Sequence, residues 1–502
     1  MLLACVPAWT SVRGVDWAAQ VYRVGFFKAQ GWVPYDTSWY GGYYPLSYSS
    51  VFPLLASHLP LGVVAVVSAG AATRGFRCLL ADRFAIRSPW ASACFVLTTT
   101  MEVAVGQLPF LLGVALATAT FVLARRRWWL FAVGTAVASS CASPVAGLFC
   151  GLAAVAWMVT SSEFRARGAA LAAAAGVPLL VSFLLFPGWG RFPFSRDDLL
   201  FIGLVAAALH LALPRRWPTL RAGIGIYLAG TVVCFVVPNA LGDNVTRLAT
   251  AAGVPLVAAG WWLRDRRRSL ALLAVPLVAW QLAPMAASVA AGSIDPSQSR
   301  LFFAPLLTAL GSYGAEPARV EVVPTRDHWE AAWVAPHLPL ARGWYRQADI
   351  ARNPLFYDPD PLTDATYEQW LRATGVRWVA VPDVRLDWSA GQESDIVRSQ
   401  PAYLQPVWTN AHWKLFAVTR QPSLVDGPAT LQNLSVDTLR LHFDSAGTAL
   451  VRVGFTPDWS VVEGAACVTA SPDGWTRITT SRPGEVQLKA ILLPVAAPGC
   501  RG

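Results

Sequence analysis

The stretch LPFLLGVALATATFVLARRR, at residues 108–127, shows the pattern that decides the fold. A largely apolar run fills residues 108–124, and three arginines follow it at once. A helix needs about 20 predominantly apolar residues to cross a bilayer, and arginines gather at the cytoplasmic ends of such helices. These residues therefore predict a membrane-spanning helix that ends in the cytoplasm.

The same pattern recurs through the first three-fifths of the chain. We predict spans near residues 52–72, 90–105, 108–124, 128–140, 144–160, 168–186, 198–213, 220–238, 248–263 and 269–288. Tight polar breaks at Gly106-Gln107 and Ser139-Ser140 separate closely coupled neighbours. With one more span at the N-terminus, this gives a polytopic helical membrane domain of about ten or eleven spans.

The connections between these spans alternate between arginine-rich and arginine-poor. The rich connections carry arginines at 74, 77, 83 and 87, then 125–127, then 165 and 167, then 215, 216 and 221, then 264 and 266–268. The poor connections carry none, or Arg247 alone, or Arg191 and Arg196 beside Asp197 and Asp198. Arginine-rich loops stay in the cytoplasm. Residues 11–50 and everything after about residue 292 are therefore expected on the extracytoplasmic side of the cell membrane.

This topology leaves too little chain for a first span. Only residues 1–9 precede the outer loop, about half a bilayer at ~1.5 Å per helical residue. We expect that the natural chain starts upstream and that its first span is truncated here.

The composition indicates that one part of the chain lies in lipid and another part in water. Of the 502 residues, 55% are hydrophobic and 14% are charged, whereas a soluble domain carries about 25% charged residues. The net charge of +10 does not indicate nucleic-acid binding, because the arginines stand at the ends of apolar segments and form no basic face.

The extracytoplasmic part divides into two. Residues 319–418 mix strand patterns at 320–323, 376–381 and 414–418 with a helical pattern at 363–374. Alternating runs at 439–443, 449–455 and 485–493 follow, with a hairpin signal at Asp473-Gly474. We predict a membrane domain at 1–291 with a large first outer loop at about 10–50, an extracytoplasmic α/β module at 292–425, and a small β-sandwich at 426–502.

The first outer loop carries the candidate chemistry, GVDWAAQVYRVGFFKAQGWVPYDTSWYGGYYPLSYSSVFPLLASHL at residues 14–59. Asp16, Gln20 and Arg23 would share one face of a helix, and Asp36 follows within the loop. Gly41-Gly42 permits a tight turn before the chain re-enters the membrane.

An acidic residue, an amphipathic helix and then W-x-G-G-x-x-P-x-x-Y resemble the first periplasmic loop of GT-C membrane glycosyltransferases. The chain is most similar to polytopic membrane proteins related to 6-pyruvoyl-tetrahydropterin synthase, and to large actinobacterial membrane proteins of that kind. Further segments carry this likeness: ASPVAG at 142–147, FPFS at 192–195, GDNVTRL at 242–248, HWEAA at 328–332, ARGW at 341–344, WL at 370–371 and GVRWV at 375–379.

The resemblance implies a sugar donor on a polyprenyl phosphate and an extracytoplasmic acceptor, an envelope glycan or glycolipid. By position, Asp16 would be the general base, with Asp36 as the fallback. Arg247 or Arg23 would hold the donor phosphate, beside Asn244. Some of these residues also have a structural explanation. Asp16 could equally well cap the loop helix or pair with Arg23. Asn244 or Asp243 could cap the helix that follows.

Glu102 is the second catalytic candidate, because an ionisable group at membrane depth is costly and often functional. A carboxylate that merely reaches the outer interface is the alternative. His328, His337 and His412, with Asp327, lack the spacing of a zinc site. A divalent cation requirement stays open.

Two other classes of function compete with the glycosyltransferase. A transporter should show pseudo-repeated halves, which the sequence does not display. A non-catalytic envelope scaffold or assembly protein needs only the outer domain, and nothing in the sequence excludes it.

The last prediction from sequence is a disulfide between Cys467 and Cys500, the two cysteines that fall in the outer sandwich. Two independent thiols are the alternative. Closing this loop should stabilise the folded chain by about 3–4 kcal/mol in the chain-entropy model. Mass spectrometry of a non-reducing digest should find the two cysteine peptides joined, and finding both thiols free would refute the bond.

Overall fold

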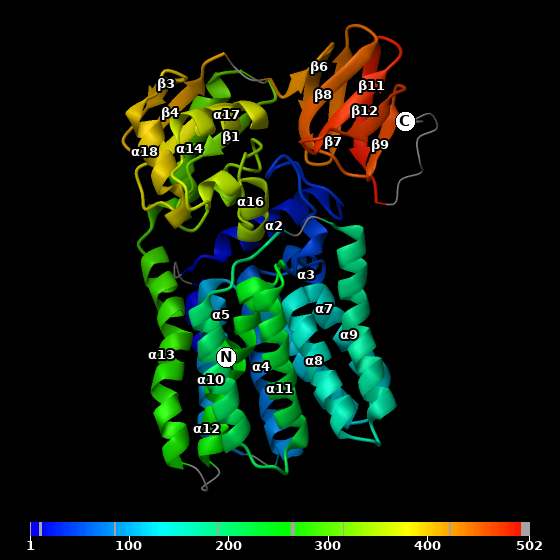
Figure 1. Cartoon of the computed structure of the whole chain (residues 1–502), viewed down its shortest axis with the longest axis vertical. Helices are drawn as coiled ribbons and strands as arrows, with labels where there is room; N and C mark the ends of the chain where they lie inside the picture. The colour runs from blue at the N-terminus through cyan, green and yellow to red at the C-terminus, as the bar shows by residue number, and fades with distance from the viewer. Residues whose placement is uncertain are drawn as a thin grey trace. The chain divides into compact units, whose positions relative to one another are not determined.

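The structure, a computed structural model, describes residues 2–9, 13–84, 87–187, 190–262, 267–314, 316–420 and 423–492. The chain folds into two compact units (Figure 1). Residues Met1–Gln20 and Ser47–Ile294 form the first, the helical unit. Residues Val21–Leu46 and Asp295–Gly502 form the second, called here the sheet unit because it holds every described strand.

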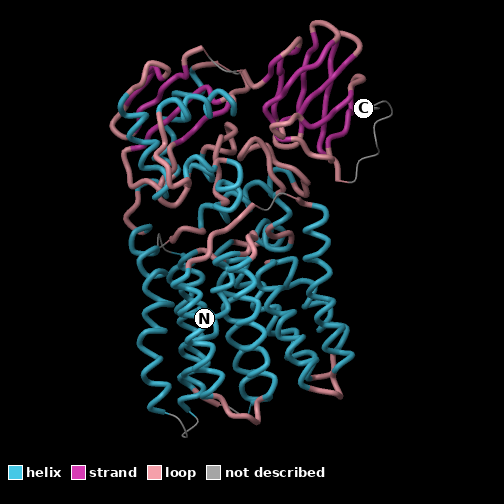
Figure 2. Tube along the Cα trace, in the orientation of Figure 1, coloured by secondary structure: helices cyan, strands magenta, loops and turns pink. Residues whose placement is uncertain are grey.

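Helices that lie side by side build the helical unit, as the trace in Figure 2 shows. They are α1 Leu2–Trp9, α3 Val51–His58, α4 Leu61–Phe84, α5 Pro89–Val105, α6 Leu108–Arg125, α7 Trp129–Ala142, α8 Pro144–Thr160, α9 Arg165–Leu185, α10 Arg196–Ala212, α11 Pro218–Val236, α12 Arg247–Trp262 and α13 Arg267–Gly292. Helix α2, Trp17–Gln30, begins in this unit and continues into the other.

Among the described residues, five helices are long and apolar enough to cross a membrane by length and composition. They cover Leu61–Asp82, Leu108–Arg125, Arg165–Leu185, Pro218–Val236 and Val275–Gly292. Shorter apolar helices at Trp129–Ala142 and Pro144–Thr160 pack beside them. The chain is therefore a membrane protein, as the sequence predicted.

Several predicted boundaries differ from the structure, among them the end of α4, which continues to Phe84, and proline explains two of the differences. The span predicted at 52–72 is two helices, because Leu59 is extended (φ −121°, ψ 148°) before Pro60 and α4 starts only at Leu61. The break predicted at Ser139-Ser140 lies instead at Ser143, which precedes Pro144 and caps α8 by accepting from the Ala146 N–H. Ser139 and Ser140 are helical and donate to the carbonyls of Gly113 and Ala175.

A mixed four-stranded sheet forms the first half of the sheet unit. Its strands are β1 Arg319–Val322, β2 Val376–Pro382, β3 Leu404–Thr409 and β4 Trp413–Val418, in the order β1-β2-β4-β3, with β1 and β2 parallel. Five helices belong to it: α14 Arg300–Ser312, α15 Glu330–Trp333, α16 Arg346–Arg352, α17 Asp364–Thr374 and α18 Gly391–Ser399. Tyr367 and Leu371 of α17 pack on Val379 and Phe416 of the sheet and form its core.

Two antiparallel four-stranded sheets form the second half, a β-sandwich. One sheet has the order β10-β11-β8-β5 and the other β6-β7-β12-β9. The strands are β5 Val425–Asp426, β6 Ala429–Leu434, β7 Thr438–Phe443, β8 Gly447–Gly454, β9 Trp459–Glu463, β10 Cys467–Ala470, β11 Trp475–Thr480 and β12 Gly484–Ala490. The predicted fold class, membrane helices followed by an α/β module and a sandwich, is confirmed.

Residues 31–46 belong to the sheet unit, whereas the sequence analysis grouped them with the membrane domain. Tyr35 donates to the Gly454 carbonyl (3.0 Å) and Thr37 to the Ser435 carbonyl (2.9 Å), both in the sandwich. The Leu340 N–H of the α/β half donates to the Ser38 carbonyl (2.8 Å). We call residues 31–46 the anchor segment, because its hydrogen bonds join the α/β half of this unit to the sandwich half.

A tight turn closes the anchor segment, as Gly41-Gly42 predicted. The Gly42 N–H donates to the Trp39 carbonyl (2.7 Å), and Gly41 and Gly42 have φ of +74° and +139°. A Cβ at Gly42 would overlap the Tyr35 ring, so no other residue fits there.

Of the two cysteines predicted to be bonded, Cys467 begins β10 and Cys500 lies outside the described residues. The bond stays a prediction.

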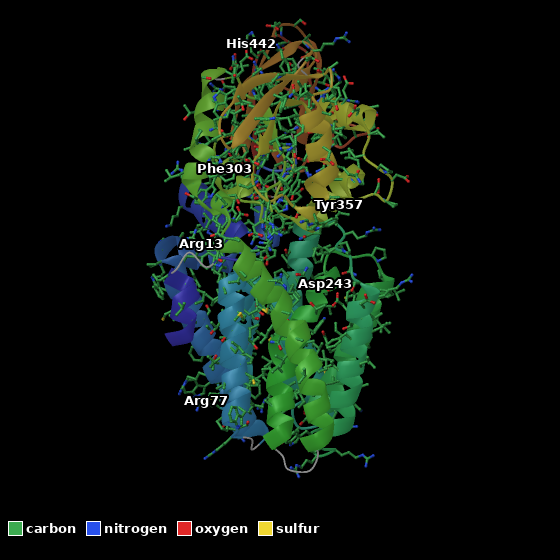
Figure 3. The ribbon with its side chains drawn as sticks, turned by 90° about the vertical axis from the view of Figure 1, so that its left-hand side faces the viewer. Arg13, Arg77, Asp243, Phe303, Tyr357 and His442 are labelled. Carbon is green, nitrogen blue, oxygen red and sulfur yellow. The ribbon has the colours of Figure 1, made fainter. Side chains whose placement is uncertain are left out.

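The arginine-rich turns mark one end of the helical unit. Arg125 at the end of α6 donates to the Asp82 carbonyl near the end of α4 (2.9 Å). Figure 3 shows Arg77 at this end and Asp243 at the other.

If arginine-rich ends are cytoplasmic, Arg126→Cys will react with an impermeant thiol reagent only after cells are opened, while Asp473→Cys, on the exposed sandwich turn, will react in intact cells. The reverse pattern, read against a background variant without the native free cysteines, would contradict the topology.

Candidate functional site

Asp16 and Arg247 meet at the end of the helical unit that carries Asp243. Asp16 directly precedes α2, and Arg247 is the first residue of α12. A carboxylate oxygen of Asp16 lies 3.7 Å from a guanidinium nitrogen of Arg247, and both side chains are largely buried. Tyr48 also hydrogen-bonds Arg247. A guanidinium held this way presents a fixed positive charge beside a carboxylate.

The backbone around Asp16 is fixed against the end of α5. The Asp16 N–H donates to the Val105 carbonyl (3.0 Å), and the Trp17 indole donates to the carbonyls of Val103 and Ala104. Gly106 ends α5 in the left-handed region (φ +99°), where a Cβ would lie 2.6 Å from the Trp17 nitrogen. Any side chain at Gly106 would therefore displace Asp16.

Glu102 lies one turn before Gly106 and completes the cluster. Its side chain is 3% exposed, and its Oε2 has no hydrogen-bond partner among the described residues. It interacts electrostatically with both Asp16 and Arg247. A buried carboxylate oxygen without a partner is costly and therefore uncommon in a structure that has no use for it.

Asp243 is a further carboxylate at this end and was given no catalytic role from sequence. It lies in the short turn η2, Gly242–Thr246, just before Arg247. Burial and then repulsion by Asp198 raise the pKa of Asp243 to about 6, while Arg247 opposes the shift. Asp198 itself accepts from the indole of Trp280 (2.9 Å). Only the fold could reveal this, because Asp198 lies in the first turn of α10 and Asp243 in η2.

An apolar cavity of about 370 Å³ lies inside the helical unit. Helices α4, α5, α6, α8, α10, α11 and α12 surround it. Phe110 and Leu248 line it near the end that holds Asp16, and Arg125 and Thr219 line its far end. The Arg247 guanidinium stands over the Phe110 ring, 5.6 Å from the centroid. A cation therefore borders the wall of the apolar space.

The remaining predicted site residues have separate environments. Asn244 lies in η2, three residues before Arg247. Asp36 is fully buried in the sheet unit and accepts from the Tyr22 hydroxyl (2.7 Å) and the Ser38 N–H (2.9 Å), and burial raises its pKa. Arg23 donates to the Tyr345 hydroxyl (3.1 Å) and stacks on that ring. Asp36 and Arg23 thus have structural contacts that account for their burial.

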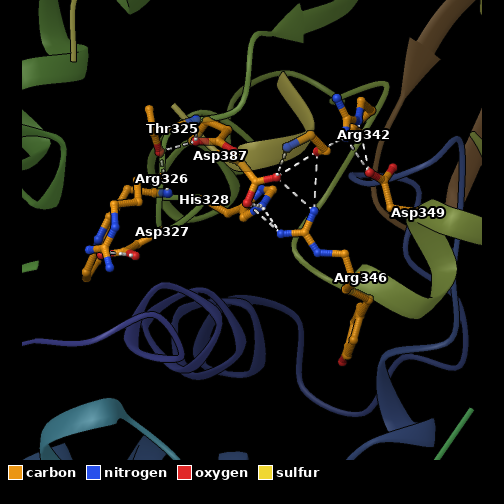
Figure 4. Close-up of polar contacts among 12 residues, drawn as sticks. Thr325, Arg326, Asp327, His328, Arg342, Arg346, Asp349 and Asp387 are labelled. Atoms are coloured by element: carbon orange, nitrogen blue, oxygen red, sulfur yellow. Dashed lines mark hydrogen bonds and ion pairs between the residues drawn. The ribbon is translucent and has the colours of Figure 1, made fainter. Parts of the chain in front are cut away.

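A second polar cluster lies in the sheet unit (Figure 4). Arg346 binds Asp387 with both terminal nitrogens, at 2.9 and 2.6 Å. His328 places one ring nitrogen 3.1 Å from Glu330 and the other 3.4 Å from Asp387. Nearby, Arg342 bridges the buried carboxylates of Asp349 and Glu393. This geometry pairs cations with carboxylates and is that of a structural network.

Charge pairing controls protonation in this cluster. Burial would lower the pKa of His328, but hydrogen bonds and charge from Asp387 and Glu330 raise it to about 9. Burial would raise the pKa of Asp387, yet His328 and Arg346 hold it well below its usual range. In the part of the chain that the structure describes, no three His, Cys, Asp or Glu side chains come together as a metal site.

No protein family model matches the chain, and no curated protein matches it in sequence. Among solved structures, it is similar to the archaeal oligosaccharyltransferase AglB from Archaeoglobus fulgidus in complex with an inhibitory peptide and a dolichol-phosphate. The TM-score is 0.45 at 10% identity, over 76% of this chain and 68% of that chain. It is also similar to an Archaeoglobus fulgidus oligosaccharyltransferase tethered to an acceptor peptide containing the NVT sequon, with TM-score 0.42 and 10% identity, over 84% of this chain and 73% of that chain.

The His328 cluster generates a pH prediction. A His whose pKa rises on folding stabilises fully below its unfolded value, and the effect is lost as pH rises through the folded value. The contribution should therefore be complete below the ordinary His value of 6.5 and disappear above about 9. A shift of this size corresponds to about 3 kcal/mol.

Hydrogen exchange of peptides covering residues 325–346, corrected for the intrinsic rate, measures this local stability. In wild type, protection of these peptides against hydrogen exchange should fall as pH rises from 6.5 to about 9. In His328→Gln, protection should depend less on pH. The other titrating groups of the cluster are common to both proteins. His442→Gln, on the sandwich with its side chain 44% exposed, is the control. Identical pH dependence in wild type and His328→Gln would refute the role of His328.

Proposed function

We propose that the protein is a membrane glycosyltransferase that moves a sugar from a polyprenyl-phosphate donor to an extracytoplasmic acceptor. The observation that carries the proposal is the cluster of Asp16, Glu102 and Arg247 beside the apolar cavity. The resemblance of the first outer loop to GT-C enzymes also points to Asp16.

The donor is amphiphilic, and the site offers both environments that it needs. Its isoprenoid tail would lie among the apolar side chains of the helical unit. Its phosphate would meet Arg247, whose forked donors suit a phosphate better than a lysine would. Asn244, three residues away, is a further candidate for the sugar phosphate.

Asp16 would act as the general base. It would accept the proton of an acceptor hydroxyl while that oxygen forms a bond to the anomeric carbon of the sugar. The bond from this carbon to the phosphate oxygen breaks, and polyprenyl phosphate leaves with its negative charge facing Arg247. Glu102 lies near this pair and interacts electrostatically with both residues, so it would help to orient the Arg247 guanidinium.

The acceptor would be a hydroxyl of an envelope glycan or glycolipid, arriving from the extracytoplasmic side. Assays with and without a chelator would show whether transfer requires a divalent cation.

Asp16→Asn tests the proposal. The amide keeps the shape but cannot take the proton, so the rate of sugar transfer should fall by about 10²–10⁴-fold. Donor binding should change much less. The measurement is transfer of labelled sugar from a panel of polyprenyl-phosphate sugars, chosen after identifying the lipid that copurifies with wild type by mass spectrometry. Asp197→Asn, an exposed carboxylate in the first turn of α10, is the matched control and should keep full activity.

Full transfer by Asp16→Asn would remove Asp16 from the chemistry and move the role to Glu102 or Asp36. Wild-type protein that neither carries a polyprenyl phosphate nor transfers any sugar of the panel would favour the non-catalytic envelope scaffold.

A further inference from the structure

The cavity of the helical unit is long. Its wall includes Phe110, near the start of α6, and Arg125, the last residue of that helix. The fifteen residues between these positions rise about 22 Å in a helix, most of the ~30 Å of a bilayer's hydrocarbon core. A volume of about 370 Å³ extending along much of α6 suits a single chain better than a bulky ring system.

The arginines at the two ends of the cavity differ in burial, because the Arg247 side chain is 16% exposed whereas Arg125 is an exposed residue. At the Phe110 end, Arg247 stands over the ring, next to Asp16 and Glu102. At the far end, Arg125 lines the cavity but donates to the Asp82 carbonyl, which stabilises the end of α4. An anionic head group is therefore expected at Arg247, with its apolar tail directed toward Arg125.

A glycine, which has no side chain, leaves the cavity wider near its far end. Gly223 lies on α11, four residues beyond Thr219, and lines the cavity. A Cβ built there meets only the Cβ of Ala156, at 3.7 Å, which is ordinary contact. Larger side chains at position 223 would project into the cavity, because Gly223 lines the cavity and its Cβ position has no other neighbour within 4 Å.

We infer that this cavity holds the isoprenoid tail of the donor, and that Gly223 lets a long tail pass to the Arg125 end, so that residue 223 determines the chain length accepted. The inference rests on the proposed function for the identity of the ligand. It adds a specificity-determining residue on a helix that contributes nothing to the Asp16 cluster.

The test measures binding of lipids by the full chain in detergent, using decaprenyl phosphate as the long probe and geranyl phosphate as the short one. Wild type should bind the long probe at least tenfold more tightly, because each added buried methylene contributes to affinity. Gly223→Leu should lose at least tenfold in affinity for decaprenyl phosphate and bind geranyl phosphate as wild type does. Gly223→Ala should be intermediate or unchanged.

Gly225→Leu is the matched control. It introduces the same side chain two residues further along α11, at an exposed glycine that does not line the cavity. Both leucine variants should fold, because leucine favours a helix more than glycine does. Thermal unfolding of each protein without lipid checks this, and Gly223→Val, judged by the same loss of affinity for the long probe, carries the test if Gly223→Leu does not fold.

Two more comparisons define the occupant and its direction. Arg247→Gln should weaken binding of decaprenyl phosphate toward that of the uncharged alcohol decaprenol, and Arg125→Gln should not. Dioleoyl phosphatidic acid, a two-chain anionic lipid, should compete poorly.

Equal binding of the long probe by wild type and Gly223→Leu would overturn the inference, and so would efficient competition by phosphatidic acid. Selective loss of long-chain binding would support it even if no sugar transfer is ever detected, and that combination would contradict only the proposed enzyme.

Discussion

The backbone of residues 14–17 lies against the C-terminal end of α5, and the candidate site depends on that contact. Hydrogen bonds from Gly14 and Asp16 to the carbonyls of Ala104 and Val105 use acceptors that a helix end leaves without partners. Gly106 makes the approach sterically possible. One contact therefore satisfies the helix end and also places Asp16 within reach of Glu102 and Arg247, which come from two different helices.

The cluster that results is expensive for stability. Two carboxylates and one guanidinium are largely buried, and burying ions costs several kcal/mol each even when they are paired. Asp16 and Arg247 form an ion pair at 3.7 Å, and Glu102 keeps one oxygen without a hydrogen-bond partner in the described part of the chain. A purely structural site would be better served by apolar side chains of similar volume. The imbalance is consistent with the proposal that the cluster meets a charged ligand.

Sequence reasoning was most successful where one physical rule dominates. Hydropathy and arginine placement predicted the membrane helices, and strand alternation with turn residues predicted β7, β8, β12 and the Asp473-Gly474 hairpin. It failed at α3 and Ser143, where proline decides the break although the apolar pattern continues. The three side chains that the structure brings together, Asp16, Glu102 and Arg247, had each been selected from depth and position, and their roles stay a prediction. Asp243 and Asp198 could not be paired, because nothing in a sequence without homologues relates the start of α10 to a short turn 45 residues later.

The first outer loop separates into two roles that look alike in sequence. Residues 14–17 present a carboxylate in the helical unit, whereas the anchor segment, with its Trp-Tyr-Gly-Gly-Tyr-Tyr core, joins the α/β module to the sandwich. Asp36 illustrates the difference, since its carboxylate holds the Tyr22 hydroxyl and the Ser38 N–H inside a fully buried turn. A carboxylate that is already saturated by fixed donors is a poor acceptor for a substrate proton. Motif resemblance over the whole loop therefore does not distinguish these two carboxylates, whereas their hydrogen-bond and ion-pair partners do.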